Sequence, residues 1–150
     1  MNDDISASSA RILLAEDDPP NRKVTQLMLG RLGYEADSVA NGLEVLQAFE
    51  AHPYDLILMD IIMPKMDGLT AAEEIRKRWP RILQPKIIAY TAYIFSDNGN
   101  GSLLKNMDGY LRKPVRREDL WTVIDGNLRA LDRQRRSALI CAWTNTTKCL

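Results

Sequence analysis

Three features are scarce in this sequence: long apolar runs, cysteine and histidine. No apolar run approaches the roughly 18 residues that span a bilayer, and the first ten residues lack the charged-then-apolar order of a signal peptide. The two cysteines, Cys141 and Cys149, both lie in the last ten residues, which is poor evidence for a disulfide framework. The single histidine, His52, precedes Pro53 and is expected to face solvent at a helix end. We therefore expect a cytoplasmic protein with no membrane insertion.

Net charge is also absent, because 20 Lys and Arg residues offset 20 Asp and Glu residues in the 150-residue chain. The balance is uneven: residues 1–60 hold four basic and eleven acidic side chains, and residues 61–150 hold sixteen and nine. The acidic first part favours cations over nucleic acid as ligands there. A basic run at the expected end of the last helix, from Arg129 to Arg136, is usually solvated, so nucleic acid is not an expected partner.

Short apolar runs alternate with segments of helical spacing along most of the chain. Strand-like runs rich in Ile, Leu and Val occur at "RILLA", "YDLILMD" and "KIIAYT", and "EADSV" and "GYLR" are weaker candidates. Helical patterns run from about 42 to 51, 69 to 79 and 120 to 131, and a first one begins soon after the first strand. Strands that are apolar throughout and joined by helices indicate an α/β fold with a parallel sheet covered on both faces.

The first helix has the clearest boundaries. Asp18 can cap its start, the two prolines that follow suit its first turn, and Gly33 suits its end. Its apolar residues share one face: Val24, Leu27, Met28 and Leu32.

Two segments fit the alternation of strands and helices poorly. "SDNGNGS" places two glycines where a fourth helix should begin, each at a cost of about 1 kcal/mol relative to Ala inside a helix. We therefore expect that helix to be short, late or mobile. The tail after Arg136 is apolar without a helical period, and we expect it to be disordered, docked on the core or bound to a partner.

Polar residues follow four of the predicted strands. Glu16, Asp17 and Asp18 follow the first strand, and Asp60 follows the third. In an open α/β sheet, ligands gather outside the carboxyl ends of the strands. Carboxylates held close together raise one another's pKa unless a cation offsets the repulsion, and Mg²⁺ takes oxygen ligands of this kind together with phosphate oxygens. These strand ends therefore predict a metal site that receives a phosphoryl group.

Asp60 is the candidate nucleophile, since an aspartate can form an aspartyl phosphate when nearby cations neutralise the transferring group. At the ends of the fourth and fifth strands, Thr91 would donate a hydrogen bond to the phosphoryl oxygens and Lys113 would supply a point charge. X-Pro bonds are where cis peptides occur, and a cis bond between Lys113 and Pro114 would aim the lysine at the crevice.

These motifs carry a family resemblance. The sequences "LLAEDD", "DLILMDIIMPKMDG", "IIAYTA" and "GYLRKP" resemble, over about residues 10–131, a response-regulator receiver domain of two-component signalling. "EDDPPNRKV" is similar in particular to the receivers of hybrid histidine kinases. The resemblance implies a flavodoxin-like doubly wound sheet of five parallel strands in the order 2-1-3-4-5 with five helices. It divides the chain into a flexible N-terminus (1–9), a receiver domain (10–132) and a C-terminal tail of unknown role (133–150).

The resemblance also implies a role for each site residue. Mg²⁺, or Mn²⁺, would be held by Glu16, Asp17, Asp60 and the main-chain carbonyl of Ile62. Asp60 would accept phosphate with the help of Thr91 and Lys113, and Thr91 and Tyr110 would form the switch. The phosphate would come from a histidine kinase or a histidine phosphotransfer domain, and a homodimer is left open. The bulky residues Ile62 and Tyr93 predict slow hydrolysis of the phosphate.

Two other functions are alternatives for this sequence. A metal-dependent phosphatase with an aspartyl-phosphate intermediate often carries a second acid two residues after its nucleophile, and here that position is Ile62. A receiver-like interaction module would keep the fold without phosphorylation. We do not expect an enzyme. We expect a signalling domain that catalyses only its own phosphorylation and dephosphorylation.

Overall fold

The computed structural model describes residues 10–92 and 104–144, with side chains described as far as Ser137. Five strands form one parallel sheet in the order β2-β1-β3-β4-β5. Buried side chains occupy all of β3 and all but the first position of β1 and β4, which is typical of strands covered on both faces. The strands are β1 (Arg11–Ala15), β2 (Glu35–Val39), β3 (Leu56–Met59), β4 (Lys86–Thr91) and β5 (Gly109–Arg112).

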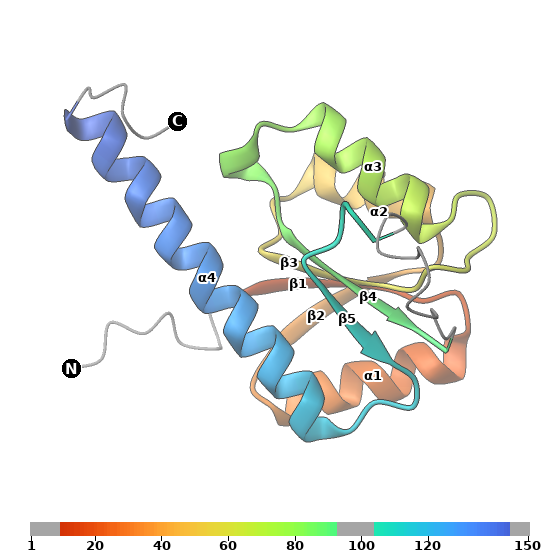
Figure 1. The fold of residues 1–150 in the computed structure, drawn as a ribbon. Coiled ribbons are helices and arrows are strands. Elements are labelled where there is room, and N and C mark those ends of the chain that lie inside the picture. The colour runs from red at the N-terminus through yellow and green to blue at the C-terminus, as the bar shows by residue number, and fades with distance from the viewer. Residues whose placement is uncertain (1–9, 93–103, 145–150) are drawn as a thin grey trace.

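Helices cover both faces of the sheet, with α1 and α4 on one side and α2 and α3 on the other (Figure 1). The core is accordingly split in two: α2 and α3 contribute Phe49 and Ile75 to one cluster, and α1 and α4 contribute Leu29 and Ile124 to the other. The helices are α1 (Pro19–Arg31), α2 (Gly42–Ala51), α3 (Gly68–Arg78) and α4 (Arg117–Thr144), with a short 3₁₀ helix, η2 (Arg81–Leu83).

The predicted fold class and strand order are confirmed. The described part of the chain holds four α-helices where five were predicted. The segment "SDNGNGS" and the helix expected to begin there fall mainly in residues 93–103, which lie outside the described residues.

Helix α1 begins and ends as predicted. The Asp18 side chain accepts a hydrogen bond from the Asn21 amide at 3.1 Å, two prolines occupy the first turn, and Gly33 follows the helix with φ of 92°. The buried face is rotated relative to the predicted apolar stripe: Met28 and Leu32 pack on the core, but Val24 and Leu27 are 55% and 58% exposed. The residues buried in their place are Thr25 and Leu29.

Helix α4 is longer than predicted. It runs for 28 residues to Thr144, so the expectation that the tail after Arg136 lacks helical structure is wrong, and the proposed boundary at residue 132 falls inside the helix. Arg135 forms an ion pair with Asp55, which ties this part of α4 to the body of the protein. The C-terminal half of α4 then extends past the sheet (Figure 1). None of the helices in the described ranges combines the length and hydropathy that a membrane span requires.

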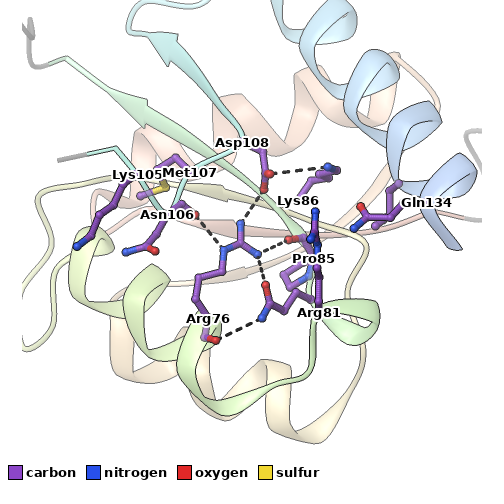
Figure 2. Close-up of a pocket in the computed structure, with 11 residues that line it drawn as sticks. Arg76, Arg81, Pro85, Lys86, Lys105, Asn106, Met107, Asp108 and Gln134 are labelled. Atoms are coloured by element: carbon purple, nitrogen blue, oxygen red, sulfur yellow. Dashed lines mark hydrogen bonds and ion pairs between the residues drawn. The ribbon is translucent and has the colours of Figure 1, made fainter. Parts of the chain in front are cut away.

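Arg76 of α3 joins three segments at the edge of the sheet opposite the strand carboxyl ends (Figure 2). Its guanidinium donates to the main-chain oxygens of Asn106 at 3.1 Å and Pro85 at 3.1 Å, and to Gln84 and Asp108 at 3.0 and 2.7 Å. These residues line a hollow of about 300 Å³. Arg76 fills most of its hydrogen-bonding capacity within the protein. We therefore interpret its role as structural, because its contacts hold the three segments together.

Replacing Arg76 with Met is expected to lower the free energy of unfolding by about 2–3 kcal/mol, because several acceptors lose a charged donor. Arg78→Met is the matched control: in the described part of the chain Arg78 pairs only with Glu74, one helical turn away at the surface, and its loss should cost at most about 0.5 kcal/mol. Urea unfolding with an unchanged m-value would measure both. Equal losses of unfolding free energy in the two variants would contradict this structural role of Arg76.

Candidate functional site

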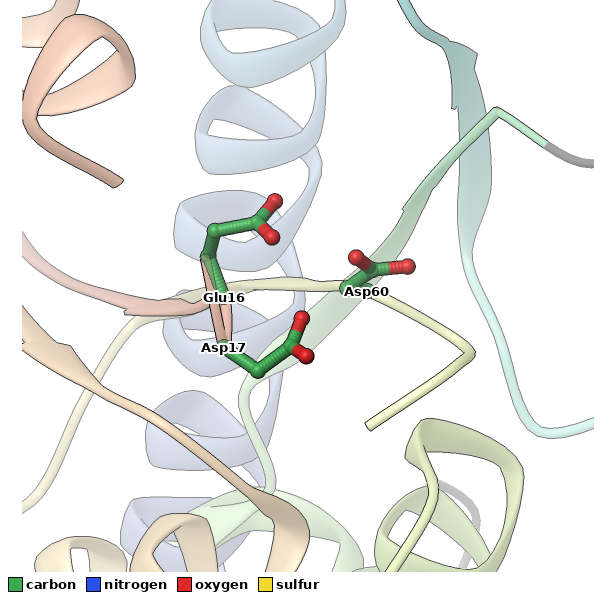
Figure 3. Close-up of side chains that lie close together, drawn as sticks. All are labelled: Glu16, Asp17 and Asp60. Atoms are coloured by element: carbon green, nitrogen blue, oxygen red, sulfur yellow. The ribbon is translucent and has the colours of Figure 1, made fainter. Parts of the chain in front are cut away.

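Three carboxylates meet at the carboxyl edge of the sheet. Glu16 and Asp17 directly follow β1, and Asp60 directly follows β3, its neighbour in the sheet. The ladder continues into these loops, since the Asp60 amide donates to the Ala15 carbonyl at 3.0 Å. One oxygen from each carboxylate lies within 4.8 Å of the others, as Figure 3 illustrates. Glu16 and Asp60 are buried and Asp17 is exposed, so the cluster opens to solvent on one side.

Lys113 completes this site from the far side of β4. Its amide donates to the Thr91 carbonyl at 2.9 Å, and the Lys113–Pro114 bond is cis, as predicted. The long side chain reaches across to place its Nζ 2.9 Å from Asp60 Oδ2 and in contact with Glu16 Oε2. A single ammonium therefore bridges two of the three carboxylates.

Burial and hydrogen bonding shift the pKa values of two groups in this cluster. Burial raises the pKa of Glu16, although the hydrogen bond and the charge of Lys113 oppose the increase. Burial lowers the pKa of Lys113, but its hydrogen bonds to Glu16 and Asp60 outweigh this effect and raise the pKa above its usual value. Lys113 therefore stays protonated at neutral pH. Three carboxylates against one ammonium leave a formal excess of negative charge, and the oxygen donors fit a hard divalent cation such as Mg²⁺.

The other predicted residues lie around this cluster. Thr91 is buried at the end of β4, and Tyr110 on β5 is 37% exposed. The Ile62 amide donates to Asp60 Oδ1 at 3.3 Å, which places this main chain against Asp60, while the part of its carbonyl in metal binding stays a prediction. Asp18 caps α1 and lies outside the cluster, as predicted. Tyr93 lies outside the described residues.

Sequence reasoning missed Tyr90 and Thr25. The Lys113 ammonium lies 4.7 Å from the centroid of the Tyr90 ring, and the Tyr90 hydroxyl lies 3.0 Å from Thr25 Oγ1. Tyr90 was hidden because an aromatic residue within an apolar strand is ordinary. Thr25 was hidden because it interrupts the apolar face of its helix. In the sequence, the one signal that could have pointed to Thr25 was a polar hydroxyl on the apolar face of α1.

Comparison with known proteins identifies the family: residues 12–125 match the model described as the response regulator receiver domain, and the chain belongs to this family. Among curated relatives, a probable histidine kinase 1 of Oryza sativa subsp. indica is 36% identical, and sensor histidine kinase GacS of Pseudomonas protegens is 35% identical. The matches cover 73% and 80% of this chain but only 14% and 13% of those longer proteins. The predicted likeness to hybrid-kinase receivers is confirmed.

Solved structures agree with this assignment. The receiver domain of sensor histidine kinase PA1611 from Pseudomonas aeruginosa, with magnesium in its active-site cleft, is 37% identical with a TM-score of 0.70. The match covers 79% of this chain and 97% of that one. Response regulator TrrA from Thermotoga maritima, in complex with Mg²⁺ and BeF, is 35% identical with a TM-score of 0.70, and the match covers 79% and 98% of the two chains.

Proposed function

We propose that this receiver accepts a phosphoryl group on Asp60 from a phosphohistidine of a partner kinase or phosphotransfer domain in the cytoplasm. The carrying observation is the three-carboxylate cluster with Lys113 bonded to Asp60. An Asp60 carboxylate oxygen forms a bond to phosphorus as the P–N bond to the donor imidazole breaks. The electron pair of that bond leaves with the imidazole nitrogen.

Each neighbour of Asp60 has a part in this transfer. Glu16, Asp17, Asp60 and the Ile62 carbonyl would hold Mg²⁺ or Mn²⁺, and the ion would neutralise charge on the phosphoryl oxygens. Lys113 holds its ammonium 2.9 Å from Asp60, where the incoming phosphoryl oxygens need a positive charge. The Thr91 hydroxyl would bond the phosphoryl group once it has arrived, and Tyr110 would follow that change at the surface.

The surface beside the site supports a protein donor. Helix α1 starts at Pro19, two residues after Asp17 of the carboxylate cluster, and presents the exposed side chains of Val24 and Leu27. Ile62, on the loop after Asp60, is 58% exposed. We propose that these exposed apolar side chains belong to the surface that the donor protein covers. Thermotoga maritima TrrA, the response regulator compared above, was also solved in complex with the histidine kinase ThkA.

The alternative functions have less support. A phosphatase of this kind would use an acid at the position of Ile62, whose apolar side chain points into solvent. A passive interaction module would have no use for a buried glutamate and a partly buried lysine beside Asp60, because burying charged groups costs free energy. We therefore propose catalysis only of the domain's own phosphorylation and dephosphorylation.

The test is phosphorylation of the full chain by acetyl phosphate and Mg²⁺, followed by intact mass. We expect a gain of about 80 Da, the mass of one phosphoryl group. The adduct should be absent from Asp60→Asn and from wild type in EDTA. It should be unchanged in Asp119→Asn, a matched control at an exposed position in the first turn of α4. A wild-type chain without adduct would favour the passive module, and an adduct on Asp60→Asn would place the acceptor elsewhere.

A further inference from the structure

We propose that Tyr90 is a positioning residue for Lys113, and that Thr25 of α1 fixes Tyr90 for this task. The inference rests on the proposed function, because Lys113 matters only if Asp60 accepts a phosphoryl group. The geometry is a chain of contacts that starts on α1, crosses β4 and ends at Asp60. Its members are Thr25, Tyr90, Lys113 and Asp60.

The first step is the contact between the Tyr90 ring and the Lys113 ammonium. The nitrogen lies 4.7 Å from the ring centroid, within the range of a cation–π interaction. Both groups are largely removed from water: Tyr90 is 6% exposed and the Lys113 side chain 16% exposed. Attraction between the negative ring face and the ammonium is stronger in such surroundings than at an open surface.

The second step is that Lys113 needs a contact that does not change during the reaction. A lysine is a flexible four-carbon chain, and holding its ammonium in one place costs conformational entropy. Within the described residues, the ammonium contacts Glu16, which the proposed metal ion would share, and Asp60, which the phosphoryl group would modify. The ammonium also contacts the ring of Tyr90, and neither event alters this contact.

The third step is the anchoring of the ring itself. The Tyr90 hydroxyl and Thr25 Oγ1 lie 3.0 Å apart in the core between the sheet and α1, and Thr25 is 2% exposed. A buried hydroxyl is costly unless it is hydrogen-bonded, so each of these groups depends on the other. The pair explains why a threonine rather than an aliphatic residue lies on the buried face of α1. The contact between the two hydroxyls fixes the hydroxyl end of the Tyr90 ring, and therefore the orientation of the ring face that Lys113 contacts.

The test uses initial rates of phosphorylation by acetyl phosphate at saturating Mg²⁺, in which Asp60 attacks phosphorus and acetate leaves with the electrons of the broken P–O bond. Tyr90→Leu removes the ring face and should slow the reaction about tenfold, the effect of losing a desolvated cation–π contact. Tyr90→Phe and Thr25→Val keep the ring and remove only its anchor, so each should slow it about two- to threefold. Tyr54→Phe is the matched control, since it removes a buried tyrosine hydroxyl bonded to Asp37 at the opposite edge of the sheet.

A second arm separates positioning from packing. In the Lys113→Ala background, Tyr90→Leu should cause no further slowing, because Tyr90 acts only through the missing lysine. In the free protein, the Lys113 ε-methylene protons should show an upfield ring-current shift by NMR that persists in Tyr90→Phe and is lost in Tyr90→Leu. Equal slowing by Tyr90→Leu with and without Lys113, or an unchanged rate, would overturn this inference alone. Absence of any adduct on the wild-type chain would overturn the proposed function as well.

Discussion

Replacing Lys113 with Ala should have two opposite effects: phosphorylation slows by about 10²-fold or more, and Mg²⁺ binds more tightly. The slower reaction follows because the ammonium lies 2.9 Å from Asp60 Oδ2, where charge on the transferring phosphoryl group must be neutralised. Initial rates with acetyl phosphate at saturating Mg²⁺ measure this effect. Saturation matters because it removes any contribution from the changed metal affinity.

The tighter metal binding follows from the contacts that Lys113 makes when no ion is bound. The ammonium touches Glu16 and Asp60, two of the three carboxylates that would hold the cation. Without it, the carboxylates repel one another with no internal compensation, and the affinity for Mg²⁺ should rise about tenfold, a modest fraction of the interaction expected between charges at this range. Calorimetric titration with Mg²⁺ measures the affinity.

Lys77→Ala is the control for the loss of one positive charge, because the partner of Lys77 among the described residues is Glu73, in an exposed pair on α3. It should leave both the rate and the affinity unchanged. Weaker Mg²⁺ binding in Lys113→Ala would show that the lysine supports the metal site instead of competing for it. An unchanged rate would remove Lys113 from the transfer step.

The strand ends could be predicted because their chemistry is local in sequence. Each polar residue directly follows an apolar run, and parallel strands deliver their carboxyl ends to one edge. The sheet places Glu16, Asp17 and Asp60 together, with Lys113 against two of them, through nothing more than this rule. The cis Lys113–Pro114 bond could likewise be predicted, because cis peptide bonds occur almost only before proline.

The features that escaped prediction depend on partners far away in sequence. The face that α1 turns to the sheet includes Thr25, whose partner Tyr90 is 65 residues away. Periodicity alone therefore favoured Val24 and Leu27, which are exposed. The continuation of α4 past residue 132 escaped for a similar reason, since Arg135 pairs with Asp55, 80 residues earlier. No local pattern encodes such contacts.

Two glycines allow the loop between Asp60 and α3 to pack closely against the neighbouring backbone. Gly42, the first residue of α2, donates its amide to the Met66 carbonyl at 2.9 Å, and a Cβ there would lie 2.6 Å from that oxygen. Gly68, the first residue of α3, donates to the Ile61 carbonyl at 2.9 Å. A Cβ at Gly68 would fall far inside van der Waals contact with the Asp60 carbonyl oxygen and 2.9 Å from Met59 Cγ. The backbone of Asp60, the proposed acceptor, therefore packs directly against a glycine.

Gly68→Ala should consequently lower the free energy of unfolding by about 3 kcal/mol, at the upper end of the usual cost of overpacking, because the contact is with main chain that cannot rotate away. It should also slow phosphorylation by about 10²-fold, since a shift of the Asp60 backbone on the order of 1 Å misplaces the nucleophile. Gly30→Ala is the matched control: no atom lies within 4 Å of a Cβ there, and helix α1 should gain about 0.5–1 kcal/mol. Urea unfolding and initial rates, measured where both variants are folded, test the pair. If Gly68→Ala were as stable and as active as Gly30→Ala, the close packing of α3 against Asp60 would not be what positions this proposed acceptor.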